Sequence, residues 1–243
     1  MQEAANRGGL CTGEPYGWQL LERSFFDRPA LEVAPEVLGT VLWHDSPEGA
    51  VAAVIVEVEA YMGPIDPASH SYRGRTARNG VMFGPPGHGY VYFTYGMHFC
   101  VNYTCGPGEE PSAVLIRAGR IIEGAGAALR RRRPDGRVIP ERELARGPGS
   151  LCQALGIDRN LDGADVCSPG SSLEVGALAG WQPLPDSEIS TGPRVGISVA
   201  ADWPWRFWVT GDRAVSAYKK SVPRRGQGKP VTGGSAGDGT MQR

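Results

Sequence analysis

Hydrophobic and polar residues alternate along VIVEVEAYMG, at positions 54–63. A period of two is typical of a β-strand, in which successive side chains point to opposite faces. The even-numbered residues from Val54 to Ala60 then face one way, and Glu57, Glu59 and Tyr61 share the other face with Ile55. Alternation alone favours a half-buried strand whose two carboxylates are solvated. The alternative is a face that lines a pocket, where an acid beside an aromatic ring would serve chemistry.

The rest of the pattern predicts further strands and a few short helices. Strands are expected at 40–43, in YVYFTYGMHFCVNYTC with a break at Gly96, in AVLIRAG, and in the late segments PRVGI and WRFWVTG. Helices are expected at 34–38, closed by Gly39, in GAGAALRRRRP and in GPGSLCQALGI. The fold class is therefore α+β, a single mixed domain built on a curved, mostly antiparallel β-sheet with short flanking helices.

The domain boundaries follow from composition at the two ends. Residues 1–17 and 221–243 are polar and rich in glycine, with too few apolar residues to fold alone, so we expect disordered tails flanking a domain at 18–220. Between the early strands, PIDPASHSYRGRTARNGVMFGPPGHG forms a loop of more than 20 residues. Compact domains seldom keep so long a loop unless it is functional.

Composition narrows the class of protein. A net charge of −1 and 41% hydrophobic residues describe an ordinary globular chain without a bulk basic signal for nucleic acid. Five cysteines without a CxxC pair indicate reduced thiols, and the four histidines lack zinc-ligand spacing. The first residues contain no apolar signal region, and no run approaches the roughly 20 apolar residues of a membrane span. We expect a soluble intracellular protein, without metal, cofactor or membrane partner.

Candidate chemistry gathers around Glu59. A general base beside the flat ring of Tyr61 suits reaction at a bound planar ring, although each residue alone is more often structural. His70 follows in the long loop, with Arg73, Arg75 and Arg78 close behind. No P-loop, dinucleotide-binding or GxSxG motif is present.

Two further features point to nucleic acid. Tyr95 precedes Gly96 at the strand break, which would place a bulky ring on an exposed tip, as in a wedge that unstacks bases. From Arg117 to Gly147, nine arginines stand against four carboxylates, a local charge of +5 that could bind phosphates. Arg117 ends an apolar run and so lies at the rim of the sheet, where it can hold a carboxylate or phosphate.

With these residues assembled, the chain resembles the 3-methyladenine (alkyladenine) DNA glycosylase family, of the compact single-domain type. The resemblance covers about 21–218. It rests on seven motifs in the family's order: FFDRPALEVAPEVLG, VEVEAYMGPIDPASHS, RTARN, MFGPPGHGYVYFTYGMHFCVN, LIRAGRIIEG, GPGSLCQALGI and PRVGI. Ala77, Gly89 and His98 depart from residues common in the family, and none of them touches the proposed chemistry.

The resemblance implies a role for individual residues. Glu59 matches the water-activating glutamate and Arg117 the arginine beside the catalytic water. The substrate pocket is implied to contain Tyr61, His70, Tyr92 and Asn102. DNA is implied to be contacted by Tyr95, which is inserted into the duplex, and by Met97, with the three loop arginines alongside. Glu57 receives no assigned role and is expected to be structural.

The function implied is a monofunctional glycosylase that flips damaged purines out of duplex DNA and starts base excision repair. The lesion class is 3-methyladenine, 7-methylguanine, hypoxanthine and ethenoadenine. No lysine stands in the motif to form a Schiff base, so strand-nicking activity is not expected. We expect a monomer in the cytoplasm at the bacterial nucleoid, or in the nucleus if eukaryotic.

Two alternatives remain at this point. The first is a non-catalytic nucleic-acid binding module, in which the aromatic residues are stacking platforms. The second is a metal-dependent hydrolase that uses Glu57, Glu59, Asp66 and His70, although their spacing is poor for metal ligation.

Overall fold

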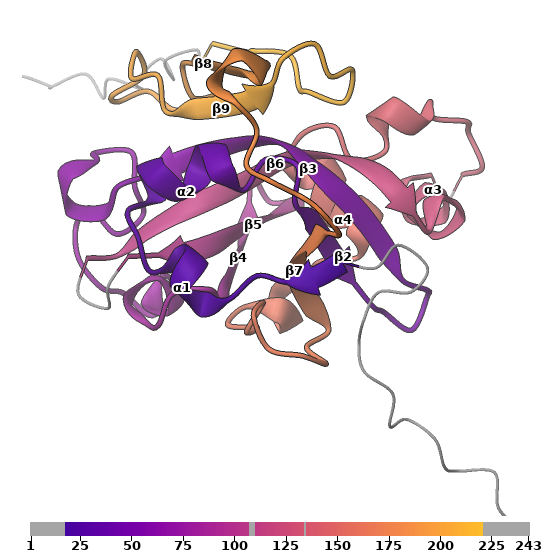
Figure 1. Cartoon of the computed structure of the whole chain (residues 1–243), viewed down its shortest axis with the longest axis horizontal. Coiled ribbons are helices and arrows are strands. Elements are labelled where there is room, and N and C mark those ends of the chain that lie inside the picture. Colours follow the sequence, from indigo (N-terminus) through magenta and orange to yellow (C-terminus); the bar gives the residue numbers. More distant parts are fainter. Residues whose placement is uncertain (1–17, 107–109, 134, 221–243) are drawn as a thin grey trace, which may run out of the picture.

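Nine strands form the centre of the molecule in a computed structural model that describes residues 18–106, 110–133 and 135–220. The predicted tails lie outside these residues. All strand pairs are antiparallel, and the main order is β1-β7-β2-β3-β6-β5-β4 (Figure 1). The strands are β1 Trp18–Leu20, β2 Val41–His44, β3 Val51–Tyr61, β4 Gly89–Thr94, β5 His98–Cys105, β6 Ser112–Glu123, β7 Leu173–Leu178, β8 Ile189–Gly192 and β9 Arg206–Val209. The predicted α+β class with a mostly antiparallel sheet is confirmed.

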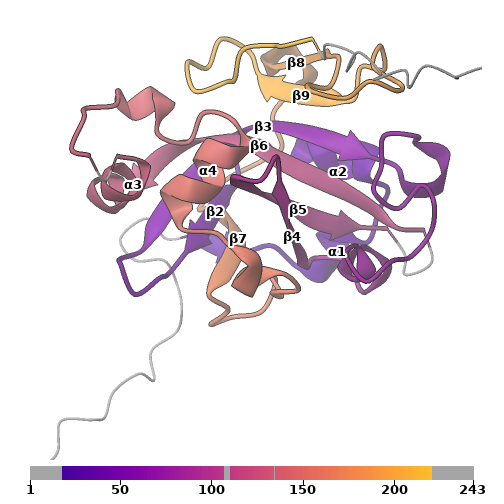
Figure 2. The same cartoon turned by 180° about the vertical axis from the view of Figure 1, so that it is seen from behind.

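Strand β3 is the central element and changes its neighbour half-way along. Its first residues pair with β2, whereas Glu57 to Glu59 pair with β9 on the same edge, and β6 runs along the other edge. β8 and β9 form a two-stranded extension that lies above the main sheet in Figures 1 and 2. The catalytic candidates therefore lie where two parts of the sheet meet.

The predicted alternation along β3 is only partly right. Ile55 packs in the same core cluster as Val58 and Ala60, whereas Val54 and Val56 pack in a second cluster. The register against β6 slips at Val56, because Ile55 pairs with Gly119 and Glu57 with Ala118. This bulge reverses the facing of the chain for the residues that follow it. The prediction of a half-buried strand is also wrong, since every residue from Val51 to Ala60 is buried.

Four α-helices flank the sheet: α1 Arg23–Phe26, α2 Ala30–Glu36, α3 Ala125–Arg132 and α4 Pro148–Leu155. The predictions for α3 and α4 are confirmed, and α4 ends at Gly156 in the left-handed conformation (φ 74°). The helix expected at 34–38 begins earlier, after Pro29. The earlier start is explained by packing, because residues 30, 33, 34 and 37 are all fully buried and have the spacing of one helical face.

The late segment PRVGI is a loop, and its prediction as a strand was wrong. Its polar groups are used elsewhere: the Arg194 guanidinium binds Asp66, and the Val195 N–H donates to Glu59. The strand at β9 is confirmed, while β1, β7, β8 and α1 were not predicted. The long loop after β3 is confirmed, with two short 3₁₀ turns at Gly63–Ile65 and Gly80–Phe83.

Candidate active site

A cavity of about 200 Å³ opens between β3, β4, β5, β6 and the loop after β8. It is smaller than the roughly 300–1,000 Å³ of sites for drug-sized ligands, as a single flat base requires. Five predicted site residues line it together with the hairpin residue Tyr95: Tyr61, His70, Tyr92, Asn102 and Arg117. The structure thus brings together residues separated by more than 50 positions in the sequence.

Glu59 is fully buried behind this cavity and its carboxylate is held by three groups. The Tyr61 hydroxyl donates to Oε2 at 2.8 Å, and the Val195 N–H donates to Oε1 at 2.7 Å. Arg117 Nη1 lies 3.1 Å from the same Oε1. Three donors from three different segments therefore fix the orientation of one carboxylate beside the cavity.

Glu57 is the centre of a second hydrogen-bond network, which lies behind Glu59. Its carboxylate accepts from Arg117 Nε at 2.8 Å, Arg206 Nε at 2.7 Å, and the N–H and hydroxyl of Ser216. Burial raises the pKa of Glu57, but the charges of Arg117 and Arg206 and the Ser216 N–H outweigh it, so the net pKa is lowered. Arg117 bridges the two glutamates, which supports the structural role expected for Glu57.

We predict that Glu57→Gln lowers the free energy of unfolding by about 3 kcal/mol at pH 7, because it removes a buried carboxylate that two arginines share. The pKa of Glu57 in the folded protein lies below its ordinary value of 4.5. Its stabilisation is therefore present above pH 4.5 and is lost as pH falls through the folded pKa. Urea unfolding of wild type and variant at pH 7 and pH 4 checks this. A difference that stays constant between the two pH values would contradict it.

The ring of Tyr61 has a cation behind it. Arg194 Cζ lies 4.6 Å from the centre of the Tyr61 ring and 5.0 Å from that of Trp205. Both Arg194 and Asp66 are fully buried, and they form two hydrogen bonds of 2.5 and 2.9 Å. Arg194 also donates to the Ala60 carbonyl at 3.0 Å. The tyrosine is thus packed against a rigid ion pair.

His70 and Tyr92 form another part of the cavity wall. Their rings meet edge to face at 4.6 Å, and His70 Nδ1 lies 3.0 Å from the Tyr90 hydroxyl. Burial and the charge of Arg78 lower the pKa of His70, so its imidazole is neutral at pH 7. A neutral wall is compatible with a positively charged base, whereas an imidazolium would repel it.

Asn102 is buried, and its Nδ2 donates to the Tyr90 carbonyl at 3.0 Å. This bond fixes the side-chain amide in the cavity wall. The side-chain amide therefore presents an anchored polar group to the cavity.

The β4–β5 hairpin ends in the exposed tip that the sequence predicts. Tyr95 and Gly96 have φ values of 52° and 70°, and the Met97 N–H closes the turn on the Thr94 carbonyl. A left-handed conformation is unfavourable for tyrosine, by about 1–2 kcal/mol. Tyr95 is nevertheless 72% exposed and Met97 68% exposed. A strained backbone that holds an aromatic ring exposed to solvent is typical of a functional position.

The loop arginines lie on the surface, and Arg78 reaches this hairpin. Arg73, Arg75 and Arg78 are exposed, and Arg78 donates to the Phe93 carbonyl and lies 5.5 Å from the centre of the Tyr92 ring. Buried Asn79 organises the loop, because its side-chain amide bonds to Thr76, Gly74 and the His70 carbonyl.

The metal alternative finds no support in the arrangement of its residues. Among the residues that the structure describes, no three His, Cys, Asp or Glu side chains gather into a group that could hold a metal ion. Asp66 instead binds Arg194. The four described cysteines are free thiols, three of them buried. Within the same residues, no helix is both long and apolar enough to cross a bilayer.

Comparison with known proteins identifies the family. A family model described as methylpurine-DNA glycosylase matches residues 24–213, well over half of the chain. This chain belongs to the methylpurine-DNA glycosylase family. It is therefore a DNA glycosylase, an enzyme that hydrolyses N-glycosidic bonds in DNA, as the resemblance implied.

The matches to bacterial relatives of this glycosylase cover almost the whole length of each relative. A protein of Streptomyces avermitilis is 54% identical over 207 residues, which is 84% of this chain and 94% of the relative. A protein of Leifsonia xyli is 50% identical, over 84% of this chain and 95% of the relative. A protein of Burkholderia cenocepacia is 45% identical, over 88% of this chain and 97% of the relative. Each of these three relatives is named "Putative 3-methyladenine DNA glycosylase".

Sequence reasoning misses three parts of the site, two of them behind the cavity wall. Tyr90, whose hydroxyl lies 3.0 Å from His70 Nδ1, receives no role from the sequence pattern. Asp66 was considered only as a metal ligand, and Arg194 and Val195 were assigned to a strand. The one signal available was the run Gly-Pro-Arg-Val-Gly, whose glycines and proline are unfavourable for a central strand.

Proposed function

We propose that this glycosylase turns damaged purines out of duplex DNA into the cavity and hydrolyses their glycosidic bond with a water activated by Glu59. The lesions proposed are 3-methyladenine, 7-methylguanine, hypoxanthine and ethenoadenine. The observation that carries the proposal is the buried Glu59 carboxylate, oriented by Tyr61, Val195 and Arg117 beside a cavity of the size of one base.

Base flipping is the first step, because the target bond of a purine cannot be reached inside the stack. A mispaired or alkylated base costs less to extrude, which gives the first selection. The exposed ring of Tyr95 then fills the vacated space, with Met97 in the minor groove. The loop arginines 73, 75 and 78 bind the DNA backbone.

Tyr95→Ser is predicted to weaken binding to lesion duplex and to slow flipping. Serine has no ring to stack on the bases, and such stacking is worth a few kcal/mol. Base release should fall at least tenfold in duplex and little in a single strand that carries the same lesion. Single-turnover assays on the two substrates check this. Ile65→Ser, which removes another exposed apolar residue that does not line the cavity, is the matched control. Unchanged activity on duplex would remove Tyr95 from the wedge role.

The cavity provides the second selection. Tyr61, opposed by His70 and Tyr92, would hold a flat ring, and alkylation at N3 or N7 makes that ring cationic. Cation–π attraction of roughly 0.5–2 kcal/mol then favours the lesion over a normal base. The anchored amide of Asn102 rejects guanine, whose exocyclic amine would clash with it or remain unpaired.

Cleavage of the bond at C1′ develops positive charge on the sugar. Glu59 would stabilise this charge and take a proton from the attacking water, and Arg117 would hold the carboxylate in line. Among the described residues that line the cavity none is a lysine, which supports hydrolysis without a Schiff base and therefore without strand nicking. We propose that the enzyme acts as a monomer on DNA in the bacterial nucleoid, in keeping with its bacterial relatives.

The decisive experiment is a lesion panel. Duplexes with a single hypoxanthine, ethenoadenine or 7-methylguanine are incubated with the enzyme and then divided, with and without alkali, which cleaves abasic sites. We expect cleavage only after alkali, and a panel without any cleavage would favour the binding-module alternative. Cleavage before alkali would contradict the monofunctional mechanism.

A further inference from the structure

The end of α3 and the loop that follows it form a basic hollow, separate from the cavity. It has a volume of about 320 Å³, and three arginines line it, Arg132, Arg133 and Arg146. The other lining residues are Val138, Ile139, Pro140 and Glu143. This hollow accounts for part of the +5 charge of the stretch from Arg117 to Gly147, of which the proposed mechanism uses only Arg117.

The three arginines have no carboxylate partner in the described ranges. Among the described residues, no Asp or Glu oxygen lies within 4.0 Å of their guanidinium nitrogens, and Glu143 pairs with Arg142 instead. Arg132 and Arg146 donate through Nε to the backbone carbonyls of Leu144 and Val215, which are neutral. These bonds fix the side chains without cancelling their charge, so the hollow is preorganised for an anion.

Electrostatics around the hollow agree with this geometry. Burial and the neighbouring charge of Arg133 lower the pKa of Arg132. An anion between the two guanidinium groups would remove this repulsion. Three positive charges against one carboxylate leave an excess of two on the lining.

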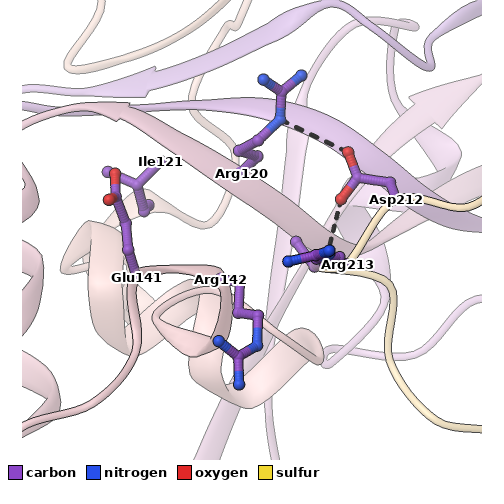
Figure 3. A pocket seen from close by; sticks show the side chains of 7 residues that line it. Arg120, Ile121, Glu141, Arg142, Asp212 and Arg213 are labelled. Carbon is purple, nitrogen blue, oxygen red and sulfur yellow. Dashed lines mark hydrogen bonds and ion pairs between the residues drawn. The ribbon is translucent and has the colours of Figure 1, made fainter.

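A second, wider hollow of about 680 Å³ provides a contrast (Figure 3). Arg120, Arg142 and Arg213 line it together with Glu141 and Asp212, and Arg120 Nε lies 3.5 Å from Asp212. Charges of both signs occupy this hollow. Its lining therefore has a smaller excess of positive charge for binding an anion than the lining of the basic hollow.

We propose that the basic hollow binds a backbone phosphate of the duplex, next to the flipped nucleotide. Arg146 lies two residues before Pro148, which lines the cavity, so their Cα atoms are at most about 7 Å apart. Successive phosphates on one strand advance about 3.4 Å along the helix axis. This separation would let a strand that delivers its base to the cavity pass within reach of the hollow. This inference rests on the proposed function only in using DNA that enters at the cavity.

The test measures the salt dependence of binding to an undamaged duplex, which is not cleaved. Arg133→Gln is the main variant, since its guanidinium has no hydrogen bond to lose within the part of the chain that the structure describes, and Arg146→Gln is the second. Each lost phosphate contact should reduce the slope of log Kd against log salt by about 0.9. The rate of base release at saturating lesion duplex should stay unchanged. Arg133→Lys, which keeps the charge, should retain the slope.

Arg120→Gln is the matched control, because it removes an exposed arginine of the balanced hollow and should leave the slope unchanged. Wild-type slope in both Arg133→Gln and Arg146→Gln would overturn the proposal, and so would an equal loss of slope in Arg120→Gln. Failure of the proposed function is distinguishable, because it would appear as no base release by wild type whatever the slopes are.

Discussion

Glu59→Gln is expected to bind lesion duplex as tightly as wild type and to lose base release by about a thousandfold or more. Glutamine keeps the shape of the side chain but cannot take a proton from water or carry negative charge opposite the developing cation at C1′. General-base catalysis contributes about 10²–10⁴ in rate, and electrostatic stabilisation adds to it. Single-turnover release and a binding titration on hypoxanthine duplex measure the two effects separately.

Glu57→Gln is the matched control for this experiment. Glu57 lies on the same strand, is equally buried and contacts the same Arg117. Its other partners are Arg206 and Ser216, whereas Glu59 bonds to Tyr61 in the cavity wall. Assayed below its lowered melting temperature, it should keep release within about tenfold of wild type. Release by Glu59→Gln at a similar level would remove Glu59 from the role of base.

The parts of the fold that depend on local pattern could be predicted from sequence. Alternation and aromatic content found β4 and β5, and a proline at the start with a glycine at the end found α4. The break at Gly96 correctly placed Tyr95 on an exposed tip. Each of these features is decided within about ten residues of chain.

The bulge in β3 could not be predicted from the strand itself. It arises from pairing with β6, where Val56 is an extra residue between the pairs of Ile55 with Gly119 and of Glu57 with Ala118. Alternation therefore gave the correct face for Glu59 relative to Glu57 but the wrong one for Val58 relative to Val56. The burial of Glu59 was equally hidden, since β9 and the loop before it come from more than 130 residues away.

The same distance in sequence concealed the pair of Arg194 and Asp66, which are 128 residues apart. A buried ion pair leaves no periodic signal, and its two members lie in loops rather than in regular elements. Its position behind Tyr61 and next to Val195 makes it the least expected part of the site. The remaining prediction concerns this pair.

Arg194→Met should lower the free energy of unfolding by about 3–5 kcal/mol and slow base release about a hundredfold. The first effect arises because Asp66 is left as a buried charge without its partner. The second arises because Arg194 packs against Tyr61, bonds to Ala60 and precedes the Val195 N–H that orients Glu59. A displacement of about 1 Å in such a group can cost about 10² in rate. Chemical unfolding and single-turnover release measure the two effects.

The double variant Asp66→Asn with Arg194→Met separates folding from positioning. Neither buried charge remains, so most of the lost stability should return, whereas the contacts to Tyr61 and Ala60 stay absent and release should remain slow. Arg28→Met, which breaks a half-exposed ion pair with Glu36 far from the cavity, should change stability by about 1 kcal/mol at most and leave release unchanged. Full release by the double variant would mean that Arg194 serves folding alone. Slow release in a stably folded double variant would instead make the ion pair behind Tyr61 a positioning element for Glu59.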